Sequence, residues 1–327
     1  MKIKKITTQI QTIPLEIPFV TALRRVENVE FIRVCILLES GLSALGEAPA
    51  TKAITGEDLE SINHAISHHK KDFLSQTVEE ALELLHQLPI GSSAKAALDM
   101  ALVSLQAQES AQELYEYLGA KQEEKIETDI TISLNSQKEM LKDAKEAYKN
   151  GFYILKVKLG SDIDHAIETT KALSLSVPKA KLLIDANQAW SVEKSLQYID
   201  TIEPKKIELI EQPVKAEDLE GLKQITQKST VPILADEAAF SLKDVKYIVE
   251  NNIADMINIK LMKCGGITKA VEILEYAREK GVKCMLGSML EGPTSIYAAE
   301  CLAMAYKDVI KYVDLDSPHL YKKGFMV

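Results

Sequence analysis

Three carboxylates and two lysines recur at an almost even interval in the second half of the chain, each at the end of a short apolar run. The carboxylates are Asp185, Glu211 and Asp236, which are separated by 26 and 25 residues. Lys158 precedes Asp185 by 27 residues, and Lys260 follows Asp236 by 24 residues. Such an interval is about the length of one strand, one helix and two short loops, so five successive strands would deliver these side chains to one rim.

The three carboxylates predict a metal site. Carboxylates gathered at close range do not all stay ionised without a cation. Oxygen ligands without His or Cys favour Mg²⁺ over Zn²⁺, with water or substrate oxygens completing the octahedron. One such carboxylate alone would more often cap a helix or pair with a lysine. Three in phase favour Mg²⁺ as the cofactor.

The lysines predict proton transfer. Lys156 and Lys158 are two residues apart in a predicted strand, so their side chains point to the same side. The alternative is a lysine pair on the outer, helix-facing side. Two ammonium groups in the interior, beside a divalent cation, depress each other's pKa, which would make one of them a base near neutral pH. Lysines on opposite faces of the substrate's α-carbon would exchange its proton with inversion, whereas one active base would suit β-elimination.

The elements that must position these residues form a regular series. Amphipathic stretches predict seven helices between eight strands, so we expect an α/β fold, a modified TIM barrel of the (β/α)₇β type. Strands two and six of such a barrel lie opposite each other, so Lys158 and Lys260 would face across it. A doubly wound open sheet is the alternative, but it gathers its ligand at one switch point. The predicted strands span residues 127–133, 154–159, 181–186, 206–211, 232–236, 256–260, 282–287 and 310–314.

The composition of the chain and its first fifteen residues indicate which partners and which cellular location to expect. The chain has 327 residues and a net charge of 39 − 48 = −9, spread along its length, which argues against a nucleic-acid partner. The four cysteines show no metal-ligand spacing, and the first fifteen residues alternate like a strand without an apolar signal core. No apolar run approaches the length of a membrane span. We therefore expect a cytoplasmic protein without a membrane partner, and we also expect a homo-oligomer.

These motifs resemble those of the enolase superfamily, in its muconate-lactonizing subgroup, over nearly the whole chain. In that family a lysine base works with Mg²⁺, which stabilises an enediolate. The barrel strands carry no histidine, which disfavours the family's histidine-base subgroup; His64 and His68, four apart on a predicted helix, fit a solvated face. The matching motifs are KVK at 156–158 and KLMKCGG at 260–266 for the bases, and DAN at 185–187, EQP at 211–213 and DE at 236–237 for the metal.

The resemblance implies a division of the chain and further roles. Residues 1–122, which are predicted as antiparallel strands followed by helices, would form an α+β capping domain with lid loops. Residues 123–310 would form the barrel, and residues 311–327 would pack back on the capping domain. Asn187 and Glu237 would support the metal site from behind its ligands.

The substrate must be inferred from other positions, because the subgroup uses one set of lysines for several reactions. Asp314 and Asp316 lie two apart at the end of the last predicted strand, and such a pair could bind an ammonium group. The alternative is an acidic surface turn. Members that epimerise dipeptides carry a similar DxD that receives the substrate's N-terminal amine. Lactonising and succinylbenzoate-forming members handle no amine.

Two loops and one strand end complete the expected substrate site. The FVTALRR loop resembles the capping-domain loop of the Ala-Glu epimerases, in which an arginine matching Arg24 contacts the glutamate side chain. Arg25 beside it departs from that pattern. Ile54 lies in a second loop, with Gly56, that we expect to close over the site. Ser288 at the end of the seventh strand, and Lys156, would also bind the substrate.

We therefore predict Mg²⁺-dependent epimerisation of Ala-Xaa dipeptides. Lys158 and Lys260 would invert the C-terminal residue by 1,1-proton transfer through a metal-stabilised enediolate. The enzyme alternatives are an N-acylamino-acid racemase and an o-succinylbenzoate synthase. A carboxylate-sensing barrel without turnover is the non-enzyme alternative. The residue types do not decide between an acidic and a hydrophobic second residue.

Overall fold

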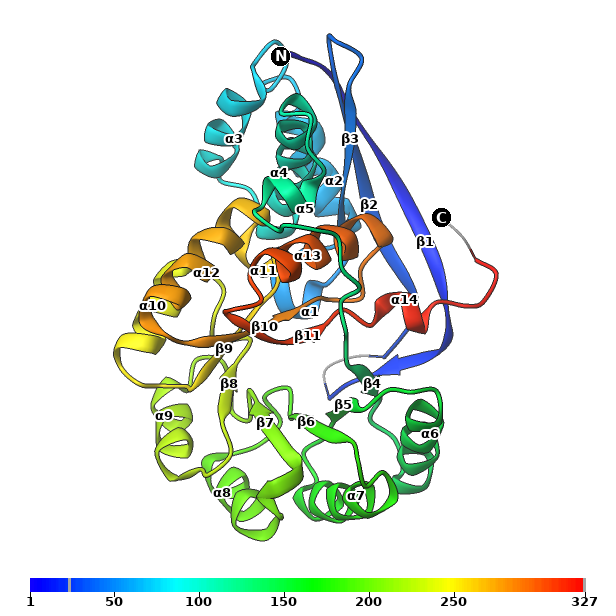
Figure 1. The fold of residues 1–327 in the computed structure, drawn as a ribbon, viewed down its shortest axis with the longest axis vertical. Coiled ribbons are helices and arrows are strands. Elements are labelled where there is room, and N and C mark those ends of the chain that lie inside the picture. The colour runs from blue at the N-terminus through cyan, green and yellow to red at the C-terminus, as the bar shows by residue number, and fades with distance from the viewer. Residues whose placement is uncertain (23–24, 326–327) are drawn as a thin grey trace.

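The computed structural model describes residues 1–22 and 25–325 and contains two sheets (Figure 1). The first sheet is antiparallel and has the order β1-β2-β3. The second has eight parallel strands in the order β11-β10-β9-β8-β7-β6-β5-β4, which is sequence order read backwards. Sequential parallel strands joined by helices are the arrangement of a β/α barrel. The predicted (β/α)₇β architecture with a separate α+β unit is therefore confirmed.

The N-terminal part packs helices on one face of the antiparallel sheet. Gly46 of β3 lies so close to α4 that an added Cβ would be 1.9 Å from the carbonyl oxygen of Ala97. Glycine is thus required where the strand and the helix backbone meet. The elements of this part are β1 (Ile3–Val20), β2 (Arg25–Leu38), β3 (Ser43–Pro49), α1 (Lys52–Thr55), α2 (Leu59–His69), α3 (Val78–Gln87), α4 (Ser92–Glu109) and α5 (Leu114–Tyr117).

The barrel strands begin and end close to the predicted positions, and only the first is clearly shorter than predicted. The strands are β4 (Ile130–Ile132), β5 (Ile154–Lys158), β6 (Lys181–Asp185), β7 (Ile207–Glu211), β8 (Ile233–Ala235), β9 (Met256–Ile259), β10 (Lys283–Gly287) and β11 (Ile310–Asp314). The connecting helices are α6 (Gln137–Lys149), α7 (Ile163–Ser176), α8 (Val192–Thr201), η1 (Pro204–Lys206), α9 (Leu219–Lys228), α10 (Leu242–Glu250), α11 (Leu261–Cys264), α12 (Ile267–Lys280) and α13 (Pro293–Ala305).

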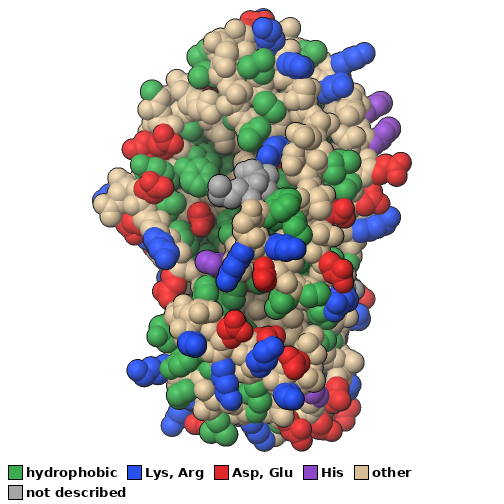
Figure 2. Space-filling view, turned by 90° about the vertical axis from the view of Figure 1, so that its right-hand side faces the viewer, with side chains coloured by type: hydrophobic (Ala, Val, Ile, Leu, Met, Phe, Trp, Pro, Cys, Tyr) green, Lys and Arg blue, Asp and Glu red, His purple; other side chains and the backbone are tan. Residues whose placement is uncertain are grey.

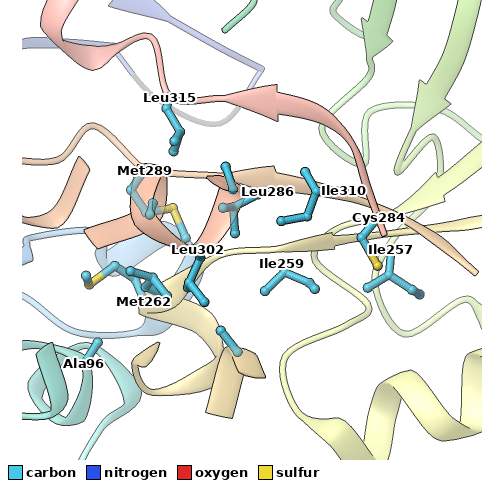
Figure 3. Close-up of a cluster of buried hydrophobic side chains, with 14 of the residues drawn as sticks. Ala96, Ile257, Ile259, Met262, Cys284, Leu286, Met289, Leu302, Ile310 and Leu315 are labelled. Atoms are coloured by element: carbon cyan, nitrogen blue, oxygen red, sulfur yellow. The ribbon is translucent and has the colours of Figure 1, made fainter. Parts of the chain in front are cut away.

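Alternation along each barrel strand separates an outer layer from an inner one. Ile257 and Ile259 of β9 lie in a buried cluster with Leu286 of β10 and Leu302 of α13 (Figure 3). The residues between them in the sequence therefore point into the barrel. There, one apolar layer fills the interior: Leu183, Leu209, Leu234, Met256, Met285 and Tyr312.

The last strand and the C-terminal segment contact the first elements. The backbone N–H of Asp129 donates to the carbonyl of Val313 at 3.0 Å, which links the beginning of the barrel to β11. After α14 (Ser317–Leu320), Tyr321 forms an antiparallel bridge with Leu15 of β1. The segment runs beside β1 in Figure 1. The domain boundaries at 122 and 310 stay a prediction.

Two further features of the structure are the mixture of charges on its surface and the character of its helices. On the face shown in Figure 2, Lys and Arg side chains intermingle with Asp and Glu side chains. Within residues 1–22 and 25–325, no helix has both the length and the apolar character that crossing a bilayer demands.

Candidate active site

A pocket lies where the carboxyl ends of the barrel strands meet the N-terminal part. From that part, Phe19 of β1 and Ile54 of α1 line it. Gly56 ends α1 with φ +77°, a backbone conformation that glycine adopts without strain. The second predicted loop, around Ile54 and Gly56, contains the one-turn helix α1, and Ile54 on this helix lines the pocket. From the barrel, polar side chains line it: Lys158, Asn187, Asp236, Glu237, Lys260, Ser288, Asp314 and Asp316.

The five predicted positions reach one rim because neighbouring strands are in register. Lys158, Asp185 and Glu211 are successive Cα partners across β5, β6 and β7. Asp236 is the first residue after β8, and Lys260 is the first residue after β9. All five side chains are buried. β5 and β9 are the second and sixth strands of the barrel, so Lys158 and Lys260 approach the pocket from opposite walls.

Each carboxylate of this rim binds at least one lysine. Lys158 Nζ lies 2.6 Å from Asp185 Oδ2, and Lys260 Nζ lies 2.7 Å from Asp236 Oδ2. Lys156 Nζ lies 2.7 Å from Glu211 Oε2. Lys156 is fully buried under the pocket, so the outward-facing alternative for the lysine pair is wrong.

The ion pairs raise the pKa values of two of these lysines, Lys156 and Lys260. Burial disfavours the charge on Lys156, but Asp314, Glu211 and Asp185 outweigh it and raise its pKa well above the ordinary value. Burial also opposes the charge of Lys260, but the carboxylates of Asp236, Glu211 and Asp314 together outweigh it, so the pKa of Lys260 is raised. For Lys156 this is the opposite of the fall that we expected for the Lys156–Lys158 pair beside a divalent cation, because carboxylates of other strands surround it.

Two buried carboxyl groups of the site, those of Glu211 and Glu237, have pKa values above the ordinary value of a glutamate. Burial, followed by the charge of Asp185, raises the pKa of Glu211 to about 7. Burial, followed by the charge of Asp236, raises the pKa of Glu237 to about 8. Two buried oxygens, Asn187 Oδ1 and Glu237 Oε2, have no hydrogen-bond donor among the described residues. An all-oxygen donor set in which buried carboxylates raise one another's pKa fits Mg²⁺.

A second group of carboxylates lies beside the first. Asp314 and Asp316 line the pocket, and Asp129 is buried behind them. One oxygen from each lies within 4.8 Å of the others, which is close enough to share a cation. Lys156 Nζ, 2.5 Å from Asp314 Oδ2, stands between the two groups. Asp314 and Asp316 are thus not an acidic surface turn.

Two family models together match most of the chain. Residues 3–119 match the mandelate racemase/muconate lactonizing enzyme N-terminal domain, and residues 139–326 match the enolase C-terminal domain-like model. The chain belongs to the mandelate racemase/muconate lactonizing enzyme family, within the enolase superfamily.

Members of this family that resemble the chain along its whole length include named epimerases. An L-amino acid-D/L-Glu epimerase of Sulfurimonas denitrificans is 55% identical over 99% of this chain and 95% of that protein. A substrate-liganded L-Ala-D/L-Glu epimerase from Bacillus subtilis has a TM-score of 0.94 and 40% identity, over 99% of this chain and 92% of that one. A dipeptide epimerase from Enterococcus faecalis complexed with Mg and L-Leu-L-Tyr also reaches 0.94, at 35% identity and the same coverage.

In this family member, three buried polar residues of the site were not predicted from the sequence. Asn258 Nδ2 donates to Glu211 Oε1 at 2.8 Å, and Lys263 Nζ lies 2.6 Å from Asp236 Oδ1. Asn258 precedes Lys260 by two residues, so the alternation that paired Lys156 with Lys158 was a usable signal. Lys263 returns to the site on the one-turn helix α11, which the periodicity did not predict. Asp129 is the third.

The predicted substrate-binding and supporting residues differ in exposure and in their hydrogen-bond partners. Arg24 lies outside the described residues. The side chain of Arg25 is 59% exposed and lies 3.4 Å from Glu27. The Ser288 hydroxyl donates to the carbonyl of Asp314 at 3.1 Å. The Asn187 backbone N–H donates to Asp185 Oδ1 at 2.9 Å, and the Asn187 side chain donates to Glu237 Oε1 at 3.4 Å.

Proposed function

We propose that this chain is a Mg²⁺-dependent dipeptide epimerase, an isomerase that inverts the C-terminal residue of an Ala-Xaa dipeptide. The observation that carries the proposal is the position of Lys158 and Lys260 on opposite walls of one pocket, with buried carboxylates between them. The similarity to named epimerases supports it.

Asp185, Glu211 and Asp236 would hold the Mg²⁺ ion. When bound, the ion would accept the substrate's α-carboxylate and make the adjacent C–H more acidic. Asn187 holds Asp185 through its backbone N–H, and Asn258 holds Glu211 through its amide, so both ligands are fixed in orientation. The ammonium groups of Lys158 and Lys260, which bind Asp185 and Asp236 in this structure, would be released toward the substrate.

The two lysines would move the proton. Lys158 as a neutral amine takes the α-proton from one face, and Lys260 as an ammonium gives a proton to the other face. One proton leaves the carbon and one returns, so the substrate differs only in configuration. Lys158 ends protonated and Lys260 ends neutral, and exchange with solvent resets both. The reverse reaction uses the lysines in exchanged roles.

Asp314 and Asp316 would bind the dipeptide's N-terminal ammonium. Both are buried and line the pocket, where an unpaired carboxylate is unfavourable. An N-acylamino acid or a succinylbenzoate precursor would bring no ammonium group to this pair, so the dipeptide fits better than either alternative substrate. Ser288 lines the same pocket, and Arg24 in the lid loop would face the second residue of the substrate.

Deuterium exchange tests the proposal. L-Ala-L-Glu and hydrophobic dipeptides are incubated with the protein and Mg²⁺ in D₂O, and we expect α-deuterium and the epimer at the C-terminal residue. No α-deuterium in any dipeptide, together with turnover of an N-acylamino acid, would overturn it. A carboxylate sensor would show no exchange at all and would bind its ligand equally well after Lys158→Ala.

Three further predictions stay open. A cytoplasmic location and a homo-oligomeric assembly are expectations from the sequence, as is the absence of a nucleic-acid partner. The preference at the second residue depends on the lid loop that contains Arg24.

A further inference from the structure

Asp129 is a fully buried carboxyl group that the proposed mechanism does not use. It precedes β4 directly, and its residue exposure is 0%. Neither carboxyl oxygen has an N–H or O–H donor within residues 1–22 and 25–325. A buried carboxylate without a donor or a cation is strongly unfavourable, so this group needs either a proton or a positive partner.

The neighbours of Asp129 indicate a proton. One of its carboxyl oxygens lies within 4.8 Å of an oxygen of Asp314 and of an oxygen of Asp316. Buried carboxyl groups this close together do not all stay ionised, so one of them is expected to hold a proton. Asp314 already accepts from Lys156 Nζ at 2.5 Å, and Asp316 accepts from the backbone N–H of Thr131 at 2.7 Å.

The charged forms of Asp314 and Asp316 therefore have donors that Asp129 lacks. Burial, followed by the charges of Asp314 and Asp316, raises the pKa of Asp129 well above its ordinary value. Burial also disfavours the charge of Asp314, but Lys156, Lys158 and Lys260 together outweigh it and lower the Asp314 pKa. The proton is thus best held by Asp129.

We propose that Asp129 is a positioning residue of the amine subsite: as a neutral carboxylic acid it donates a hydrogen bond to Asp314 and holds that carboxylate toward the pocket. The inference rests on the proposed function, because the amine subsite is the Asp314–Asp316 pair. Its consequence concerns the charge that the substrate meets. The subsite presents two negative charges rather than three, beside the positive charge of Lys156, and this suits one organic ammonium better than a divalent ion.

Two substitutions separate the donor from the charge. Asp129→Asn keeps a donor of similar shape, and Asp129→Ala removes it. We expect Asp129→Ala to raise the KM for L-Ala-L-Glu by about tenfold or more, because a hydrogen bond to a charged group is lost, with a much smaller change in kcat. Asp129→Asn should recover most of that loss. A merely structural role would lower the active fraction, and hence kcat, without this split and rescue.

An infrared measurement tests the proton itself, whether or not the protein is an epimerase. In the difference spectrum between the Mg²⁺-loaded wild type and Asp129→Asn at neutral pH, we expect the C=O band of a protonated carboxylic acid to be lost. Glu127→Gln, which changes an exposed carboxyl two residues away, should leave that band in place. If no such band is lost, or if Asp129→Asn raises KM as much as Asp129→Ala, Asp129 is ionised and the proposal is wrong.

Discussion

Two groups of three carboxylates lie side by side in this barrel, and they differ in what neutralises them. Asp185, Glu211 and Asp236 each meet a lysine, and their backbone positions follow from the register of neighbouring strands. The Asp129, Asp314 and Asp316 group meets only Lys156 among the described lysines within ion-pair distance. It also has a backbone N–H donor at Asp316.

The difference indicates that one residue type serves two kinds of cation. Lys158 and Lys260 of the first group line the pocket and can move toward a substrate, which leaves carboxylate oxygens of Asp185 and Asp236 for a dication. Lys156, which Glu211 and Asp314 share, is fully buried and stays in place. With the proton that we propose on Asp129, the second group keeps charge for a single ammonium. The amount of positive charge that stays in place, rather than the number of carboxylates, distinguishes the two sites.

The largest expected effect comes from the lysines that serve the first group. Lys158→Ala and Lys260→Ala should each lower the rate of dipeptide epimerisation by roughly 10³-fold or more, because a positioned acid or base is removed. The measurement is the rate of epimer formation by NMR. Lys181→Ala, which removes an exposed lysine at the other end of β6, should change the rate little. Equal loss in all three variants would contradict the assignment.

Removing one charge from the first group should separate metal binding from amine binding. We expect Asp185→Asn to weaken Mg²⁺ by about 100-fold, since changes around a metal site cost 10- to 100-fold and this residue would be a ligand. Calorimetric titration with Mg²⁺ gives the affinity without any need for turnover. Asp314→Asn is the matched control in the second group and should leave Mg²⁺ affinity nearly unchanged. An equal loss of Mg²⁺ affinity in the two variants would contradict the assignment of the metal to the first group.

The same control variant should have its own effect on the substrate. Asp314→Asn should raise the KM for L-Ala-L-Glu roughly 30-fold, since the loss of one partner of a buried charge pair costs about 2 kcal/mol or more. Steady-state kinetics at saturating Mg²⁺ gives the value. An unchanged KM would mean that the ammonium binds elsewhere.

The smallest expected effect is a pH dependence of the second group. Burial, followed by the charge of Asp314, raises the pKa of Asp316 to about 6. As pH falls through this value Asp316 becomes neutral, so amine binding weakens, and kcat/KM should fall about tenfold for each unit below it. Asp316→Asn should remove this limb of the pH profile. Persistence of the limb in that variant would assign it to another group.

The two groups were unequally predictable from the sequence. Lys158, Asp185 and Glu211 end strands whose apolar alternation is strong, and parallel strands of equal spacing bring their ends to one rim. Asp129 gave no such signal, because its partner Asp314 is reached only where the barrel closes between β4 and β11. The register across that closure depends on the whole barrel and not on any local pattern.

The errors have a similar physical origin. The expected fall in lysine pKa considered the two lysines that are neighbours in sequence and a divalent cation, but not the carboxylates around them. The carboxylates that reverse the effect come from other strands, such as Glu211 and Asp314 around Lys156. Lys263 was missed because it depends on one turn of helix after a strand end. Effects that sum over several strands require the assembled barrel.

We expect the first group to bind the metal and the second group to bind the substrate's amine. The most direct test is a crystal structure with L-Ala-L-Glu and Mn²⁺, whose preference for oxygen ligands resembles that of Mg²⁺ and whose anomalous signal locates it. We expect one Mn²⁺ peak within coordination distance of Asp185, Glu211 and Asp236, and the dipeptide's ammonium at Asp314 and Asp316. A Mn²⁺ peak held by Asp129, Asp314 and Asp316 instead would contradict it.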